Sequence, residues 1–167
     1  MVLPDRWNAR FRWFAKCSEH EVWLDPSSGR VFKATYGRRY GLSFVGEGDG
    51  NALDYLKRIA LSNRFFDTNL RFEGVWLDRN ELRIVVSQRF VYGENTSIDR
   101  ISVFMKERGF EACDVGAKRV YYRSADNLVV ADLHEQNVLT ARDGALFPID
   151  VIIGKPGPEL EQVLLNL

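Results

Sequence analysis

The sequence predicts an α+β domain. Three observations favour this class: short segments rich in β-branched and aromatic residues, two segments whose apolar residues recur at helical spacing, and turn residues between these segments. The order along the chain is strands with one helix, strands again, a second helix and then hairpins, which is typical of an α+β fold. Because the chain has 167 residues, 46% of them hydrophobic, we expect it to bury the core of one domain spanning residues 1–167.

The first elements are predicted to be strands. Residues 12–24 are predicted to be extended and residues 30–35 to form a second strand, with a turn at residues 25–29, where Pro26 and Gly29 favour chain reversal. The glycine-rich residues 37–50 predict a loop around a short strand at residues 42–45.

A helix is predicted from Asn51, which can cap it, to about Phe66. Its expected apolar stripe consists of Ala52, Tyr55, Leu56, Ile59 and Ala60. The charged residues expected on its other faces are Asp54, Lys57 and Arg58.

The later elements are predicted from similar patterns. Residues 70–77 and 82–91 favour an antiparallel pair, and residues 97–108 favour a helix that Gly109 ends. Asp143-Gly144 is the clearest hairpin indicator in the chain. The remaining predicted segments are short apolar runs at residues 120–122, 128–130, 137–139 and 145–149, and a helix at residues 159–165.

Composition narrows the possible partners and compartments. The 23 basic and 23 acidic residues balance, so nucleic-acid binding is not expected. No apolar run approaches the roughly 20 residues of a membrane-spanning helix, and the N-terminus does not resemble a signal peptide. The cysteines Cys17 and Cys113 and the histidines His20 and His134 have no zinc-ligand spacing, so we expect free thiols in a cytoplasmic protein.

Oxygen-bearing side chains gather on either side of the Asp143-Gly144 turn. Strand pairing across this turn is expected to bring Asn137 and Asp150 to the same end of the hairpin, and a carboxylate with an amide suits Mg²⁺ that carries nucleotide phosphates. Asp132, one loop earlier, is placed to accept a proton from a hydroxyl. The alternative interpretation is a loop in which these side chains cap turns.

The stretch Asp132-Leu133-His134-Glu135-Gln136-Asn137, followed by Asp150, resembles the catalytic loop and metal-binding aspartate of the protein-kinase-like superfamily, which includes aminoglycoside and other small-molecule phosphotransferases. The resemblance implies that Asp132 is the catalytic carboxylate, that Asn137 is a metal ligand and that Asp150 is the principal metal ligand. ATP and Mg²⁺ are the cofactors it implies.

Upstream segments extend the resemblance. Val31-Phe32-Lys33 is similar to the strand whose lysine holds the α and β phosphates, and residues 87–91 resemble the hinge that contacts adenine. The implied nucleotide contacts are Lys33, Gln88, Phe90 and Ser18. More narrowly, Ser18-Glu19-His20, Tyr55-Leu56-Lys57-Arg58 and Ser87-Gln88-Arg89-Phe90 resemble the kinase-like domain of phage and mobile-element polyvalent proteins, and the resemblance spans residues 18–156.

This resemblance implies a small β-rich N-lobe with one helix at about residues 10–91 and a minimal, truncated C-lobe at residues 92–167. The sequence also departs from the family. No glycine-rich phosphate loop precedes His20, Val130 stands in place of the catalytic-loop histidine, and no clear glutamate on the first helix can pair with Lys33.

Two functions are compatible with this resemblance and with the departures from it. The first is an ATP- and Mg²⁺-dependent phosphotransferase that moves a γ-phosphate to a hydroxyl of a protein or a small molecule. The alternative is a catalytically inactive kinase-like module that binds a nucleotide or another protein. If the resemblance were coincidental, Lys33 and Asp150 would lie far apart.

Overall fold

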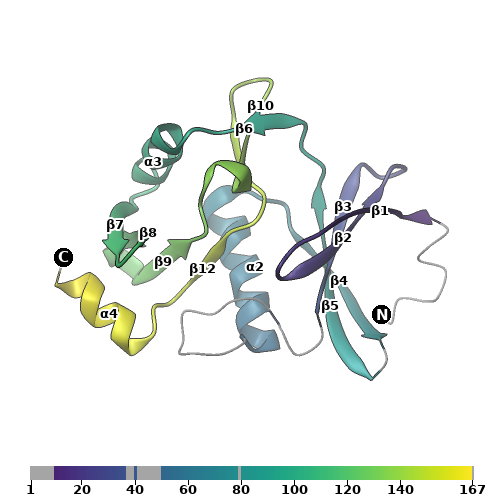
Figure 1. The fold of residues 1–167 in the computed structure, drawn as a ribbon, viewed down its shortest axis with the longest axis horizontal. Coiled ribbons are helices and arrows are strands. Elements are labelled where there is room, and N and C mark those ends of the chain that lie inside the picture. The colour runs from purple at the N-terminus through teal and green to yellow at the C-terminus, as the bar shows by residue number, and fades with distance from the viewer. Residues whose placement is uncertain (1–9, 37–39, 41–49, 79, 167) are drawn as a thin grey trace.

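The predicted α+β class is confirmed. The computed structural model describes residues 10–36, 40, 50–78 and 80–166. In these residues the strands pair in antiparallel fashion in three sheets, and helix α2 crosses the middle of the molecule between the largest sheet and the remaining strands (Figure 1). The strand predicted at residues 42–45 lies outside the described residues. Helices α2, α3 and α4 are all too short or too polar to cross a membrane.

The largest sheet has five strands in the order β1-β2-β3-β5-β4. These strands are β1 (Arg12–Lys16), β2 (His20–Asp25), β3 (Arg30–Thr35), β4 (Arg71–Asp78) and β5 (Glu81–Arg89). The two predicted strand pairs are confirmed, with Lys33 opposite Val86 in the register that joins them.

The prediction of one extended segment over residues 12–24 was wrong, because the chain reverses at residues 17–19. Trp13 consequently lies opposite Trp23. The Cys17 N–H donates to the His20 carbonyl at 2.9 Å, and the Tyr36 hydroxyl donates to the carbonyls of Cys17 and His20. These bonds satisfy backbone groups that a tight reversal would otherwise leave without partners.

Helix α2 (Ala52–Phe66) begins as predicted, since Asn51 Oδ1 accepts a hydrogen bond from the Asp54 N–H at 2.9 Å. Its buried face, however, differs from the predicted stripe. Leu56 and Ala60 are exposed, whereas Arg58 is 8% exposed and therefore buried. The buried residues of the helix are Tyr55, Arg58, Ile59, Ser62 and Phe66. This set follows the spacing of one helix face, but two of its members are polar.

The rest of the chain forms two smaller sheets and two helices. The four-stranded sheet contains β12 (Ile152–Gly154), β9 (Leu128–Ala131), β8 (Lys118–Arg123) and β7 (Glu111–Val115), in that order. The three-stranded sheet contains β11 (Leu146–Pro148), β10 (Val138–Ala141) and β6 (Gly93–Asn95), in that order. The helices are α3 (Ile98–Lys106) and α4 (Pro158–Leu165).

The predicted helix at residues 97–108 and the hairpin at Asp143-Gly144 are therefore confirmed. Gly109 ends α3 as predicted, with a φ of 77° that favours glycine. Strands β6, β7 and β12 were not predicted. Of these, β12 matters most for the site, because it pairs with β9 from a position about 20 residues later in the chain.

The largest hydrophobic core joins α2 and α3 to the smaller sheets. Its buried members are Phe66, Ile101, Phe104, Met105, Phe110, Tyr121, Leu128, Val130, Leu133, Val138, Val151 and Ile153. A second cluster holds α2 against the five-stranded sheet through Tyr55, Ile59, Ile84 and Val86. Helix α2 is thus fixed on both sides by apolar contacts, and this fixes the direction in which its polar side chains point.

Candidate functional site

Two strand pairings bring Asp132, Asn137 and Asp150 together. Ile152 of β12 pairs with Ala131 of β9, so the next position along this register places Val151 beside Asp132. In the neighbouring hairpin, the Ile149 N–H donates to the Asn137 carbonyl at 2.8 Å. Asp150 lies between these two points. The expected meeting of Asn137 and Asp150 at one end of the hairpin therefore agrees with the strand register.

The loop that carries Asp132 is held by its neighbours. Leu133 is 6% exposed and belongs to the largest core, whereas the side chains of Asp132 and His134 are half exposed. The Asn137 Nδ2 donates to the Asp132 carbonyl at 2.8 Å and to its Oδ2 at 3.0 Å. Asp132 has a φ of 60°, a left-handed conformation that Asp and Asn adopt more readily than most other residues.

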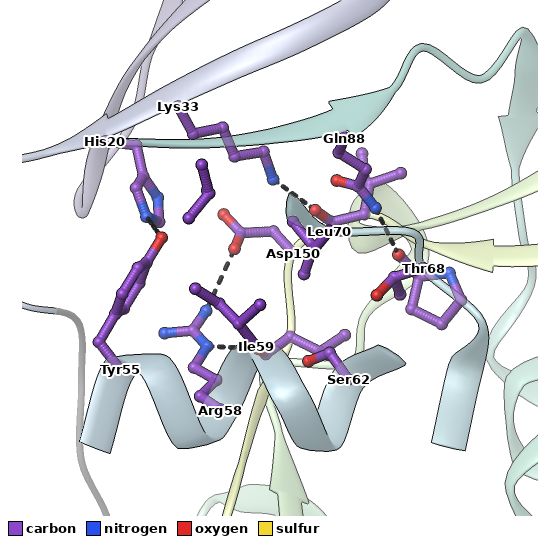
Figure 2. A pocket seen from close by; sticks show the side chains of 14 residues that line it. His20, Lys33, Tyr55, Arg58, Ile59, Ser62, Thr68, Leu70, Gln88 and Asp150 are labelled. Atoms are coloured by element: carbon purple, nitrogen blue, oxygen red, sulfur yellow. Dashed lines mark hydrogen bonds and ion pairs between the residues drawn. The ribbon is translucent and has the colours of Figure 1, made fainter. Parts of the chain in front are cut away.

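Lys33 reaches this group of residues from the five-stranded sheet. Its Nζ donates to the Ile149 carbonyl at 2.5 Å, and Lys33 and Asp150 line the same inner cavity. Figure 2 shows Lys33 and Arg58 directed toward Asp150 from opposite sides. The two residues that a coincidental resemblance would leave far apart are therefore neighbours.

Arg58 is a site residue that the sequence interpretation missed. From α2 its Nη1 contacts both carboxylate oxygens of Glu19, at 3.0 and 2.9 Å. Its Nε donates to the Val151 carbonyl at 2.6 Å, and its Nη2 lies 3.2 Å from Asp150 Oδ1. The sequence does contain one indication that Arg58 is buried: it follows Tyr55 by three residues, so both lie on the same face of the helix.

The charges around Asp150 control its ionisation. Burial alone would raise the pKa of this carboxyl, but the positive charges of Lys33 and Arg58 hold it below its ordinary value. Burial would likewise lower the pKa of Arg58, but Glu19 and Asp150 raise it above the ordinary value. At neutral pH both groups are therefore charged.

His20 occupies the edge of the same compartment. It is 2% exposed, and its Nε2 lies 2.7 Å from the Tyr55 hydroxyl. Burial is the main reason that its pKa falls from 6.5 to about 3. Burial also raises the pKa of Tyr55. The His20–Tyr55 pair is consequently uncharged at neutral pH, and its hydrogen bond can run in either direction because each partner can donate or accept.

Two cavities meet at the predicted hinge. The inner one, which Lys33 and Asp150 line, has a volume of about 20 Å³, enough for roughly one water-sized sphere. The outer one has a volume of about 930 Å³ and is lined by the hinge residues from Gln88 to Tyr92, the β2–β3 turn and the segment after α2. Thr68 and Gln88 line both cavities, so the two are adjacent.

The predicted nucleotide contacts Gln88, Phe90 and Ser18 lie in different surroundings. Gln88 is buried at the junction of the cavities, where its Nε2 donates to the Pro148 carbonyl at 3.4 Å. Phe90 lines the outer cavity, and its N–H donates to the Gly29 carbonyl at 2.9 Å, so this N–H is already occupied. Ser18 lies in the exposed turn after β1 and lines neither of these two cavities.

Replacing Arg58 tests the buried ion network. Arg58→Met should lower the free energy of unfolding by about 3–5 kcal/mol, because the guanidinium that balances the buried Glu19 carboxylate would be lost. The double variant Arg58→Met/Glu19→Met should lose less than the sum of the two single variants. Urea unfolding at pH 7 measures all three proteins. Arg64→Met, at an exposed position of the same helix, is the matched control and should change stability by less than about 0.5 kcal/mol. Equal effects at positions 58 and 64 would contradict the network.

The low pKa of His20 predicts a pH-dependent stability. Between pH 6.5 and about pH 3 the unfolded state binds a proton at this residue and the folded state does not. Lowering the pH through this window therefore favours unfolding, and from pH 7 to pH 5 His20 alone should remove roughly 2 kcal/mol. Comparison of unfolding curves for the wild type and His20→Gln isolates this contribution. His134→Gln, which removes a histidine from an exposed loop, should keep the wild-type pH dependence; loss of the dependence in both variants would refute the assignment.

Comparison with known proteins agrees with this geometry. A family model described as serine/threonine/tyrosine kinase found in polyvalent proteins matches residues 6–154. No match was found among curated proteins or among solved structures. Since the matched region covers most of the chain, the resemblance to the kinase-like domain of polyvalent proteins is confirmed. The chain belongs to the family of serine/threonine/tyrosine kinases found in polyvalent proteins.

Proposed function

We propose that the chain is an ATP- and Mg²⁺-dependent phosphotransferase that transfers the γ-phosphate to a hydroxyl of a protein or small-molecule acceptor. The observation that carries this proposal is the convergence of Asp132, Asn137 and Asp150 at the ends of two strand pairs, opposite Lys33. Phosphoryl transfer depends mainly on positioning and on neutralising charge, and this group of residues supplies the groups for both.

Asp150 and Asn137 are the residues proposed to hold the metal. Both offer the hard oxygen ligands that Mg²⁺ prefers. Arg58 contacts Oδ1 of Asp150, so Oδ2 is the oxygen proposed for the metal, and Nδ2 of Asn137 bonds to Asp132, so its Oδ1 is proposed likewise. When bound, Mg²⁺ would neutralise the charge on the transferred phosphate.

Lys33 and the outer cavity are proposed to bind the nucleotide. The ammonium group of Lys33 would hold the α and β phosphates from its place beside Asp150. The outer cavity, at about 930 Å³, is within the size range of cavities that bind small molecules, and Phe90 and Tyr92 offer aromatic rings to a base. Gln88 lies between the two regions. Residues 10–91 and 92–167 would then act as the two lobes.

Asp132 is proposed to act on the acceptor. Its carboxylate would orient the acceptor hydroxyl and take up its proton while the hydroxyl oxygen forms a bond to phosphorus and the ADP oxygen leaves. Asn137 holds the Asp132 side chain in place through a hydrogen bond of 3.0 Å. This contact supports a fixed direction for the carboxylate, which general-base action requires. A cytoplasmic location, where ATP is abundant, is part of the proposal.

A second candidate is an inactive nucleotide-binding or protein-interaction module. The observation that favours it is the turn at residues 17–19, which stands where a glycine-rich phosphate loop is expected. Glu19 of this turn is bound to Arg58, and the inner cavity beneath has a volume of only about 20 Å³. Triphosphate binding would therefore require the turn or the ion pair to shift.

Nucleotide binding is tested by thermal unfolding with ATP and Mg²⁺. Ligand at about 100 times its dissociation constant should stabilise the folded wild type by roughly 2.7 kcal/mol and raise the melting temperature. Asp150→Asn should lose most of this increase relative to its own unliganded state. Asp143→Asn, the same change in the neighbouring hairpin turn, should keep it. If millimolar ATP with Mg²⁺ leaves the wild-type melting temperature unchanged, both the transferase and the nucleotide-binding alternative fail.

Asp132→Asn separates catalysis from binding. Asparagine tolerates the left-handed backbone at this position but cannot take up the proton, so ATP turnover or autophosphorylation should fall by about 10²- to 10⁴-fold. The ATP-dependent rise in melting temperature should remain. Radiolabelled ATP provides the assay, and Asp143→Asn is again the control. Unchanged turnover in Asp132→Asn would remove Asp132 from the mechanism, and a wild type that binds ATP without turnover would favour the inactive module.

A further inference from the structure

Cys17, His20 and Asp150 form a group of side chains that could bind a metal, and this group shares only Asp150 with the pair proposed for Mg²⁺. One ligand atom from each of the three residues lies within 4.8 Å of the others. The Cys17 Sγ is 4.0 Å from the His20 Nδ1. We propose that these three residues form a binding site for Zn²⁺.

The three ligands come from separate parts of the chain, and each is held in position. Cys17 lies in the turn after β1, which the bond from its N–H to the His20 carbonyl closes at 2.9 Å. His20 begins β2, and Asp150 lies just before β12. Glu19 ties the same turn to Arg58, which also contacts Asp150. The ion network therefore positions the ligands before any ion binds.

The donor atoms suit zinc better than magnesium. Zn²⁺ accepts thiolate sulfur, imidazole nitrogen and carboxylate oxygen, often with three protein ligands and an open fourth position, whereas Mg²⁺ prefers oxygen. The Cys17 thiolate and the Asp150 carboxylate would together balance the charge of the ion. Glu19 offsets the charge of Arg58, whereas Lys33 and Arg83 are cations whose charge opposes binding. Cys17 is exposed, so an ion can enter from solvent.

The hydrogen bond with Tyr55 orients the His20 ring for metal binding. Its Nε2 is 2.7 Å from the Tyr55 hydroxyl, so an N–H at Nε2 can donate to Tyr55 while Nδ1 presents its lone pair toward Cys17. Histidines that bind metals commonly donate their second ring N–H to such an outer partner.

Small side-chain movements would complete the coordination. In a tetrahedral zinc site the sulfur and nitrogen ligands are about 3.6 Å apart, compared with 4.0 Å between Cys17 Sγ and His20 Nδ1. Rotation of Cys17 within its exposed turn can close this difference. Arg58 contacts Oδ1 of Asp150, which leaves Oδ2 as the oxygen for zinc.

Zinc binding does not depend on the proposed transferase activity. Zinc binding would nevertheless affect that activity, because Asp150 belongs to both proposed sites. If Asp150 binds a nucleotide-bound Mg²⁺, the two metals exclude each other. Only this mutual exclusion of Zn²⁺ and Mg²⁺ rests on the proposed function. The test below uses the unliganded protein and no nucleotide, so the zinc site can fail while the transferase stands, and the reverse.

The experiment is a titration of the reduced full chain with Co²⁺, a spectroscopic substitute for Zn²⁺. A thiolate ligand gives a near-ultraviolet charge-transfer band, and four-coordination gives intense visible bands. We expect both in the wild type at one Co²⁺ per chain, and Zn²⁺ should bleach them. Cys17→Ser should lose the charge-transfer band, whereas Cys113→Ser, which removes the other cysteine, should retain it. Tyr55→Phe should weaken zinc binding by about 10-fold or more in a chelator competition.

Several outcomes would overturn the site. These are an absent charge-transfer band in the wild type, a band that persists in Cys17→Ser, or a band that disappears in Cys113→Ser. Circular dichroism of each metal-free variant shows whether it is folded. Should Cys17→Ser fail to fold, Asp150→Asn provides the second variant: it keeps the thiolate band but should lose four-coordinate visible intensity and bind Zn²⁺ at least about 10-fold more weakly.

Discussion

The buried guanidinium of Arg58 is the group on which the arrangement of the site depends. A charge removed from water is costly unless each of its donors finds an acceptor and its charge is balanced. Here the acceptors come from three places: the Glu19 carboxylate in the turn after β1, the Val151 carbonyl before β12 and the Asp150 carboxylate. The position of each segment is therefore constrained by the need to satisfy one side chain of α2. Helix α2 is itself held between two apolar clusters, so the backbone that carries Arg58 is fixed.

This network distributes charge differently from the pattern that the kinase resemblance implies, in which a strand lysine pairs with a helix glutamate. In this chain the helix provides the cation, Arg58, and the turn provides the anion, Glu19. Lys33 still reaches the segment that carries Asp150, where it donates to the Ile149 carbonyl. The Lys33 ammonium group therefore still lies beside Asp150, although the helix forms its ion pair with the turn at residues 17–19 and not with Lys33. Helix α2 carries no glutamate, and its Arg58 instead links the turn at residues 17–19, through Glu19, to the segment that carries Asp150.

The sequence was sufficient to predict features that depend on local patterns. Asn51 as a helix cap, Gly109 as a helix end and the Asp143-Gly144 hairpin each follow from backbone preferences of neighbouring residues, and all three were confirmed. Features that depend on distant partners were missed. Arg58 was placed on the outer face of its helix because its partners Glu19 and Asp150 are 39 and 92 residues away. Likewise, β12 is three residues long, so its pairing with β9 becomes visible only in the folded chain. The grouping of Asp132, Asn137 and Asp150 was anticipated through the family motif and one hairpin, whereas the second strand pairing that completes it was not.

Asp132, Asn137 and Asp150 each precede a residue of the same core. Leu133 follows Asp132, Val138 follows Asn137 and Val151 follows Asp150, and all three apolar residues are buried in the largest hydrophobic cluster. Side chains in a close-packed core have little freedom to shift, because displacement opens a void or causes overlap. The polar residue beside each of these buried residues is therefore also restrained, although the side chain of Asp132 is half exposed. The core thus brings loops from separate strand pairs to a common position, and the left-handed backbone of Asp132 is held there by Leu133 on one side and by the Asn137 hydrogen bonds on the other. Precision at the site is therefore a property of packing beneath it, and the ion network around Arg58 sets the charge that this precise arrangement presents.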